Sequence, residues 1–263
     1  MQKSGDYMNL YFELLQEPIF TMEYVNQYYN NIESARSAVK RLIKQKLAVK
    51  IRSNLYTCIS GETCSPVASR YQIACHITKS AYISHHTAIE YHGLSDQVYY
   101  DVYVSSKTRF QEFDFDGYTY KYIAAKGESG VVNVQYSGGV RVTDMEKTLI
   151  DSIKDMDRIS GIEEVVAFIQ TIRKLDEKKL CKYLEEYDNQ FLFQKVGYLL
   201  ETYYASGTLS EEFYKLCKNN IGKSKRYLSK EIMQGIYNDE WKLIVSDRAA
   251  YLKNGVNSDY DRI

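Results

Sequence analysis

One stretch of the chain, from Glu33 to Tyr56, combines a helix pattern and a strand pattern with a local concentration of positive charge. After Glu33 it contains no acidic residue, although the whole chain has 34 basic and 34 acidic side chains and no formal net charge. Up to about Lys46 the apolar residues recur at helical spacing. From Leu47 apolar and other residues alternate as far as a Ser-Asn pair, after which a second run returns. The basic side chains of the stretch are Arg36, Lys40, Arg41, Lys44, Lys46, Lys50 and Arg52.

The helical half of this stretch has two distinct faces at about 100° per residue. Its apolar face predicts packing against two earlier helices, expected over residues 6–16 and 22–28. Its other face is basic and has small side chains near the amino-terminal end, which suits a helix entering a DNA major groove about 12 Å wide. Lys46 is expected on the packing side. The apolar face holds Ile32, Ala35, Ala38, Val39, Leu42 and Ile43, and the polar face holds Arg36, Ser37, Lys40, Arg41 and Lys44.

The strand half predicts a β-hairpin that turns at Ser53-Asn54. Leu47, Val49 and Ile51 are expected on its packed face, with Ala48, Lys50 and Arg52 on its open face. Asn54 tolerates the left-handed conformation that a tight turn requires. Three helices followed by a hairpin within residues 1–60 are the order of a winged helix-turn-helix. The predicted DNA contacts are Ser34, Arg36, Ser37, Lys40, Arg41 and Lys44 of the helix, and Arg52 and Asn54 of the hairpin.

Two other interpretations of the basic stretch stay open. A surface helix can carry lysine and arginine simply as a solvated face, and winged helices also serve as protein-docking modules. Phosphate contact is favoured because the basic hairpin follows the helix directly and no acid interrupts the two. Ser34 and Ser37 lie near the helix amino terminus, where backbone amides favour phosphate.

The remainder of the chain predicts a second domain over residues 67–263, after a short polar linker at 61–66. Its β-rich part covers residues 98–140, where Asp116-Gly117 between alternating runs is a hairpin signal. Its helical part covers residues 143–252, and Thr143 with Glu146 before an apolar run predicts a capping box. The fold class is therefore α+β: a winged helix-turn-helix followed by a mixed α/β domain with a largely helical carboxy-terminal part.

A second basic cluster lies near the end of the helical part. It could be an auxiliary phosphate contact or a docking site for an acidic or nucleic-acid partner. It could equally be a solvated helix end, where cations complement the helix dipole. Its candidate contact residues are Lys218, Lys223, Lys225 and Arg226.

No catalytic constellation is found. Ser105-Ser106 before Asp114 and Asp116 lacks the glycine and the spacing of a nucleotidyltransferase site, and Asp116 is explained by its turn. Asp144, Glu146 and Lys147 lack nuclease spacing, because adjacent side chains point apart. No phosphate-binding glycine motif occurs. The histidines are too poorly placed for zinc and are expected to be structural; they are His76, His85, His86 and His92. We therefore predict no enzyme activity, no metal and no cofactor.

Bulk composition is that of an ordinary globular chain. The 5 cysteines are scattered and odd in number, which indicates reduced thiols in a reducing compartment. No apolar run approaches the roughly 18 residues of a membrane span. Acids within the first apolar run argue against a signal peptide, so a cytoplasmic location is expected.

Three motifs, in order over about residues 5–155, resemble the AbiEi-type antitoxins of bacterial AbiE abortive-infection systems, which are type IV toxin–antitoxin modules. The first is Ala35-Arg36, Leu42-Ile43-Lys44, Leu47, Arg52 and Leu55-Tyr56. The second is Tyr82-Ile83-Ser84, Ala88-Ile89 and His92-Gly93-Leu94. The third runs from Arg141 to Asp151, RVTDMEKTLID. The family's hairpin turn usually contains glycine, whereas this chain has Ser53-Asn54 at that position.

The resemblance implies a cytoplasmic repressor of its own operon that reads inverted repeats in promoter DNA with its winged helix. It also implies that the carboxy-terminal domain counters a nucleotidyltransferase-like toxin encoded beside it, directly or indirectly. The alternative is a winged-helix protein-interaction module, or a solitary transcriptional regulator without a toxin partner.

Overall fold

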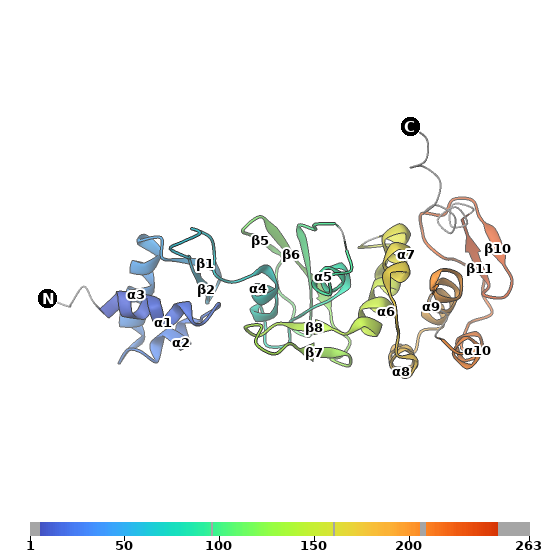
Figure 1. The fold of residues 1–263 in the computed structure, drawn as a ribbon, viewed down its shortest axis with the longest axis horizontal. Helices are drawn as coiled ribbons and strands as arrows, with labels where there is room; N and C mark the ends of the chain where they lie inside the picture. The colour runs from blue at the N-terminus through green and yellow to red at the C-terminus, as the bar shows by residue number, and fades with distance from the viewer. Residues whose placement is uncertain (1–5, 96, 160, 206–208, 247–263) are drawn as a thin grey trace, which may run out of the picture. The chain divides into compact units, whose positions relative to one another are not determined.

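A computed structural model describes residues 6–95, 97–159, 161–205 and 209–246 of the chain (Figure 1). Its mixed helices and sheets confirm the predicted α+β class. Contacts divide the chain into two compact units. The first unit comprises residues 1–83, 99–127 and 132–142, and the second comprises 84–98, 128–131 and 143–263. The domain boundary expected near Gly61 lies inside the first unit, and the last part of the helical region expected over 143–252 lies outside the described residues.

The first unit begins with three helices: α1 (Asp6–Leu15), α2 (Met22–Asn26) and α3 (Ile32–Lys44). Each of the last two starts at a side-chain cap. Thr21 accepts a hydrogen bond from the backbone N–H of Tyr24, and Asn31 accepts one from that of Ser34. These helices enclose a core that α3 supplies with Ala35, Ala38, Val39 and Leu42 and that α1 supplies with Leu10, Tyr11 and Leu14.

Two residues predicted on the packed face of α3 lie at its margin instead. Ile32 and Ile43 are 36% and 37% exposed. Lys46, expected on the packing side, is exposed and has a φ of 59°. This left-handed residue ends the helix: the N–H of Leu47 donates to the carbonyl of Leu42, and that of Lys46 donates to Ile43.

Strands β1 (Ala48–Arg52) and β2 (Leu55–Cys58) form an antiparallel hairpin with its turn at Ser53-Asn54, as predicted. Phe20 forms an isolated antiparallel bridge with Tyr56 of β2. The predicted alternation is wrong in part, because the register shifts between Lys50 and Arg52. Ala48 and Ile51 are both buried in consequence. After a bulge of this kind, the next side chain no longer points to the face that strict two-residue alternation predicts.

The expected linker at 61–66 is a compact turn. The N–H of Ser60 donates to the carbonyl of Ser65, and Ile59 pairs with Pro66. Helix α4 (Arg70–His76) follows, with a capping box between Ser69 and Gln72.

The main sheet of the first unit has the strand order β5-β6-β4-β3-β8-β7. Its long central pair, β4 (Asp101–Ser106) and β6 (Tyr118–Ala124), is parallel. Asp116-Gly117 joins β5 (Phe113–Phe115) to β6 as the predicted hairpin, with both residues at positive φ. The remaining strands are β3 (Tyr82–Ile83), β7 (Val131–Asn133) and β8 (Arg141–Thr143). Helix α4 packs beside β3 and β4.

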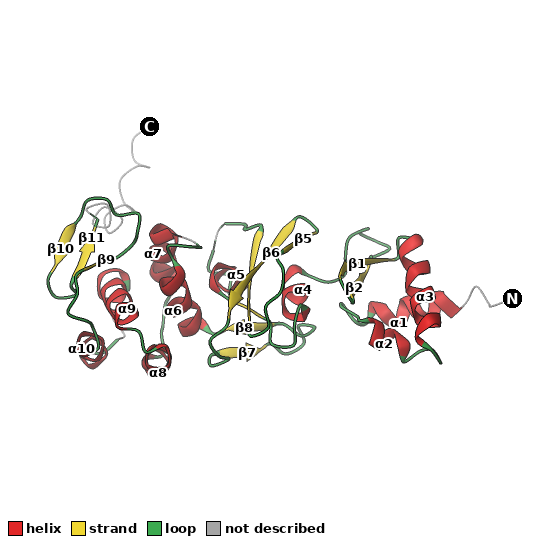
Figure 2. Ribbon diagram, turned by 180° about the vertical axis from the view of Figure 1, so that it is seen from behind, coloured by secondary structure: helices red, strands yellow, loops and turns green. Residues whose placement is uncertain are grey.

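The second unit is helical from its first element to Asn219 (Figure 2). Its core includes apolar residues of every helix and the fully buried Trp241. The helical prediction is wrong for Arg226–Val245, where three short strands form a sheet of order β10-β11-β9. The helices are α5 (His85–Tyr91), α6 (Met145–Asp155), α7 (Gly161–Thr171), α8 (Glu177–Tyr187), α9 (Gln190–Tyr203) and α10 (Glu211–Asn219), and the strands are β9 (Arg226–Tyr227), β10 (Ile236–Asn238) and β11 (Leu243–Val245).

Gly197 on α9 makes room for Trp241, because a Cβ at this position would overlap the indole ring. We expect Gly197→Ala to destabilise the second unit by about 1–3 kcal/mol through overpacking, despite a gain in helix propensity of about 1 kcal/mol. Chemical denaturation measures the change. Gly127→Ala is the control, since a Cβ there meets nothing within 4 Å. Equal stabilities of the two variants would contradict this packing argument.

Candidate nucleic-acid interface

The polar face of α3 is open to solvent. Arg36, Ser37, Lys40, Arg41 and Lys44 are all exposed and lie opposite the buried Ala35, Ala38, Val39 and Leu42. Ser34 is half-buried, and its backbone N–H is already bound by the Asn31 side chain. The structure therefore gathers the basic residues predicted on this helix on one surface. Ser34 lies at the edge of that surface, in the first turn.

Glu33 forms an ion pair with Arg36 on this basic face. Its Oε1 lies 2.5 Å from Nη1 of Arg36, and the two side chains are 74% and 60% exposed. Ion pairs this exposed stabilise proteins by about 0–1 kcal/mol. A phosphate can therefore displace Glu33 from Arg36 at little cost.

Asn54 holds the tip of the hairpin against the start of α2. Its Oδ1 accepts a hydrogen bond from the backbone N–H of Met22 at 2.9 Å, and its Nδ2 donates to Glu23 at 2.7 Å. The hydrogen bond from Asn54 keeps the pKa of Glu23 below its ordinary value. Asn54 has a φ of 57°, the left-handed conformation expected at this turn. Both polar ends of its side chain thus serve to position the hairpin.

Arg52, predicted to contact DNA, instead lies against the main sheet of the first unit. Its guanidinium carbon is 5.0 Å from the centre of the Phe113 ring and 5.7 Å from that of Phe110. Lys50, in contrast, is exposed on β1. The hairpin cation that solvent reaches most readily is therefore Lys50, which the sequence-based choice of contacts omitted. The bulge after Lys50 changes which of the two cations is open to solvent. The alternation of residue types in the sequence does not reveal this bulge.

The second basic cluster is largely occupied by internal contacts. Lys218 lies 3.2 Å from Glu201, also pairs with Glu240, and sits 5.0 Å from the centre of the Trp241 ring. Lys225 lies over Tyr237 and Arg226 over Phe191, at 4.3 Å and 5.1 Å. Only Lys223 of the predicted set is exposed without such a contact among the described residues. The cluster is less open to a partner than its sequence suggests.

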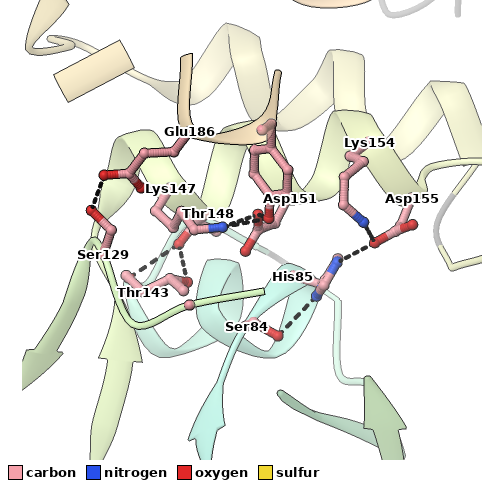
Figure 3. Close-up of polar contacts among 12 residues, drawn as sticks. Ser84, His85, Ser129, Thr143, Lys147, Thr148, Asp151, Lys154, Asp155 and Glu186 are labelled. Atoms are coloured by element: carbon pink, nitrogen blue, oxygen red, sulfur yellow. Dashed lines mark hydrogen bonds and ion pairs between the residues drawn. The ribbon is translucent and has the colours of Figure 1, made fainter. Parts of the chain in front are cut away.

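The third motif of the sequence, Arg141 to Asp151, contributes side chains to a buried polar network on α6 (Figure 3). Lys147 and Asp151 are 6% and 3% exposed and form an ion pair. The hydroxyl of Tyr187 on α8 donates to Asp151 at 2.5 Å and accepts from Lys147 at 2.6 Å. The ion pair is thereby completed by a side chain from another helix.

The predicted capping box between Thr143 and Glu146 is wrong. The cap of α6 is Asp144, whose Oδ1 accepts a hydrogen bond from the backbone N–H of Lys147 at 2.9 Å. Thr143 is fully buried at the end of β8, with its hydroxyl 2.7 Å from that of Thr148.

The carboxylates of Asp144 and Glu146 reach α8 and the residue that caps it. Asp144 accepts from the Tyr183 hydroxyl at 2.8 Å and from Lys179 at 3.0 Å. Glu146 accepts the backbone N–H of Asp176 at 2.7 Å. These carboxylates therefore hold α6 against α8, and their partners leave no open chemical site.

Ser84, His85 and Asp155 form a serine–histidine–aspartate series (Figure 3). The Ser84 hydroxyl is 2.8 Å from Nδ1 of His85, and Nε2 of His85 is 3.2 Å from Asp155. Ser84 and His85 are 0% and 2% exposed, so a substrate carbonyl has no route to this hydroxyl. The series is a structural link between the start of α5 and the end of α6.

The described parts of the chain contain no group of three or more histidine, cysteine, aspartate or glutamate residues that could hold a metal ion. Nε2 of His92 donates a hydrogen bond to the carbonyl oxygen of Thr143 at 2.8 Å. No helix among the described residues has the length and apolar character needed to cross a bilayer.

Comparison with known proteins bears on the fold alone. No family model matches the chain, and no curated protein matches it. The crystal structure of the RV2827C protein from Mycobacterium tuberculosis is similar, with a TM-score of 0.65 at 12% sequence identity. The similarity covers 95% of this chain and 94% of that one. The arrangement of helices and sheets described above is therefore shared over almost the whole length of both chains.

Asn54→Ala should destabilise the first unit by about 2–3 kcal/mol, because alanine loses both hydrogen bonds and is strained in the left-handed conformation. Asn54→Gly is the matched control, since it loses the same bonds without the strain and should be the milder change. Thermal unfolding of both variants measures the difference. If alanine were tolerated as well as glycine, the left-handed turn would not be a constraint.

Proposed function

We propose that residues 1–60 form a winged helix-turn-helix and that the chain is a DNA-binding transcriptional regulator. The observation that carries the proposal is the polar face of α3, where Arg36, Lys40, Arg41 and Lys44 are exposed together opposite a closed core. A helix of 13 residues is about 20 Å long, enough to lie along a major groove. In this proposal α3 is the recognition helix and the β1–β2 hairpin is the wing.

The proposed contacts divide into base readout and phosphate positioning. Arginine can form paired hydrogen bonds with guanine, so Arg36 and Arg41 are the proposed readers of sequence. Lys40, Lys44 and the hairpin's Lys50 are proposed to contact phosphates, which fix the orientation of a protein on the duplex. Ser37 lets the helix backbone approach the groove. The contacts of Arg52 and Asn54 within the protein argue for positioning roles.

We further propose that the regulator is an antitoxin and autorepressor without enzyme activity. It would bind inverted repeats in its own promoter in the cytoplasm and counter a nucleotidyltransferase-like toxin encoded beside it. The three motifs that resemble AbiEi-type antitoxins support this, since they occur in the same order along the chain. The occupied polar groups of α6 support a structural role for the third motif. The competing proposal is a winged-helix protein-interaction module or a solitary regulator.

Replacing Arg36 and Arg41 together with alanine should abolish specific binding to the promoter DNA while the fold survives, because both side chains are exposed. Losing paired contacts from two arginines weakens specific binding by about 2–6 kcal/mol. Fluorescence anisotropy with a labelled duplex from upstream of the reading frame measures the affinity, and circular dichroism checks the fold. The charge-matched control is Arg173→Ala with Lys174→Ala, two exposed residues of the second unit. Unchanged affinity in the α3 variant would show that α3 is not the recognition helix.

Lys44→Ala should weaken binding to all duplexes alike, since a phosphate contact carries no sequence information. The slope of log affinity against log salt should become shallower by about one unit. A titration at several salt concentrations measures this slope. An affinity that does not fall with salt in the unmodified protein would favour the protein-interaction module over DNA binding.

A further inference from the structure

The second unit contains a cavity whose charged lining residues are mostly basic. It lies at the carboxyl end of α6 and the amino-terminal part of α9, and its volume is about 200 Å³. That volume corresponds to about seven water molecules in the liquid. Its charged lining residues are Lys154, Arg158, Lys195, Lys230, Asp155 and Asp157. Neither the DNA contacts nor the polar network around Lys147 uses this cavity.

Both carboxylates of the lining are already bound. Asp155 pairs with Lys154 and lies 3.2 Å from Nε2 of His85. Asp157 accepts from the Ser229 hydroxyl at 2.7 Å and from the backbone N–H of Lys230 at 3.0 Å. Burial alone would raise the pKa of each carboxyl, but these hydrogen bonds hold both pKa values below the ordinary one. The carboxylates therefore remain ionised, and Oδ2 of Asp157 also forms an ion pair with Lys195.

Lys195 is a buried cation with too few partners. It is 3% exposed, and its one polar partner among the described residues is Asp157, at 3.4 Å. An ammonium group can donate three hydrogen bonds. The ring of Phe191 lies 4.7 Å from Nζ and supplies a weaker contact. Burial lowers the pKa of Lys195, and the neighbouring Asp157 and Asp155 carboxylates oppose that shift.

Arg158 and Lys230 are exposed, and the described residues give their side chains no ion pair or hydrogen bond. Asn189, the cap of α9, also lines the cavity, so the amino terminus of a 14-residue helix lies beside it. The positive end of a helix dipole favours an anion. Three under-used cations thus surround a space that can admit a small anionic group.

We propose that this cavity binds a phosphate group, carried either by inorganic phosphate or by a phosphorylated small molecule such as a nucleotide. Lys195 meets the phosphate inside the cavity, while Arg158 binds it with two parallel hydrogen bonds and Lys230 adds a charge near the opening. A duplex backbone does not fit this description, because Lys195 is almost fully buried. The site is independent of the DNA-binding function proposed above.

Isothermal titration calorimetry of the full chain with inorganic phosphate and with adenosine monophosphate, at about 0.15 M ionic strength, tests the proposal. Binding of either ligand supports it, and the tighter of the two identifies the source of the phosphate group. Arg158→Ala with Lys230→Ala should raise the Kd by about tenfold or more, since each removes a charge-assisted hydrogen bond. Lys195→Met should have at least as large an effect if it folds.

Two charge-matched double variants are the controls. Arg173→Ala with Lys174→Ala, and Arg36→Ala with Arg41→Ala, should each leave the phosphate Kd within about twofold of the unmodified protein, because none of these residues lines the cavity. The proposal is overturned if neither ligand binds, or if the Arg158 and Lys230 double variant binds as tightly as the controls. It is also overturned if that variant loses duplex affinity while phosphate binding is unchanged.

Discussion

The ion pair between Lys147 and Asp151 is the interaction on which the second unit depends most. Two charges this deeply buried lose their hydration, and only close geometry with further hydrogen bonds offsets that loss. Tyr187 supplies those bonds, so α6 and α8 must lie together for the pair to be tolerated. Removing one member of such a pair typically destabilises a protein by about 3–5 kcal/mol. Asp144 and Glu146 add further bonds from α6 to the start and body of α8. The position of α8 is therefore fixed by polar as well as apolar contacts.

This network marks where prediction from the sequence succeeds and where it fails. The presence of a helix after Thr143 could be predicted, because capping residues and apolar spacing are local signals. The identity of the cap and the role of Glu146 could not, since both depend on Asp176, Lys179 and Tyr183, which are distant in sequence. The hairpin at Asp116-Gly117 could be predicted, because its signal lies within two adjacent residues. The cap, in contrast, depends on residues that are distant in the sequence. The strands after Arg226 are two or three residues long and carry too little periodicity to be distinguished from helix.

The first unit shows the same division at its proposed DNA surface. The buried and exposed faces of α3 follow from residue spacing, and only Ile32 and Ile43 at the margin depart from it. Arg52 departs because a bulge in β1 and the aromatic rings of Phe110 and Phe113 decide its orientation. Those rings come from a distant part of the chain. The cavity of the second unit could not be predicted from the sequence, because its cations are spread from Lys154 to Lys230 and form no motif.

The two basic segments differ as surfaces for an anionic partner because nearby acidic side chains neutralise their cations to different degrees. The number of basic residues does not distinguish them. In sequence the α3 segment and the cluster around Lys218 are similarly dense in lysine and arginine. In the folded chain Lys218 is paired with Glu201 and Glu240, both supplied by other segments, and is held over Trp241. On α3, by comparison, the pair between Arg36 and Glu33 is exposed and weak. Since charges further than about 8 Å are largely screened at physiological ionic strength, the chain's overall neutrality does not weaken the field above α3. A neutral protein can therefore present a surface to DNA that is as basic as that of a protein with a large net charge.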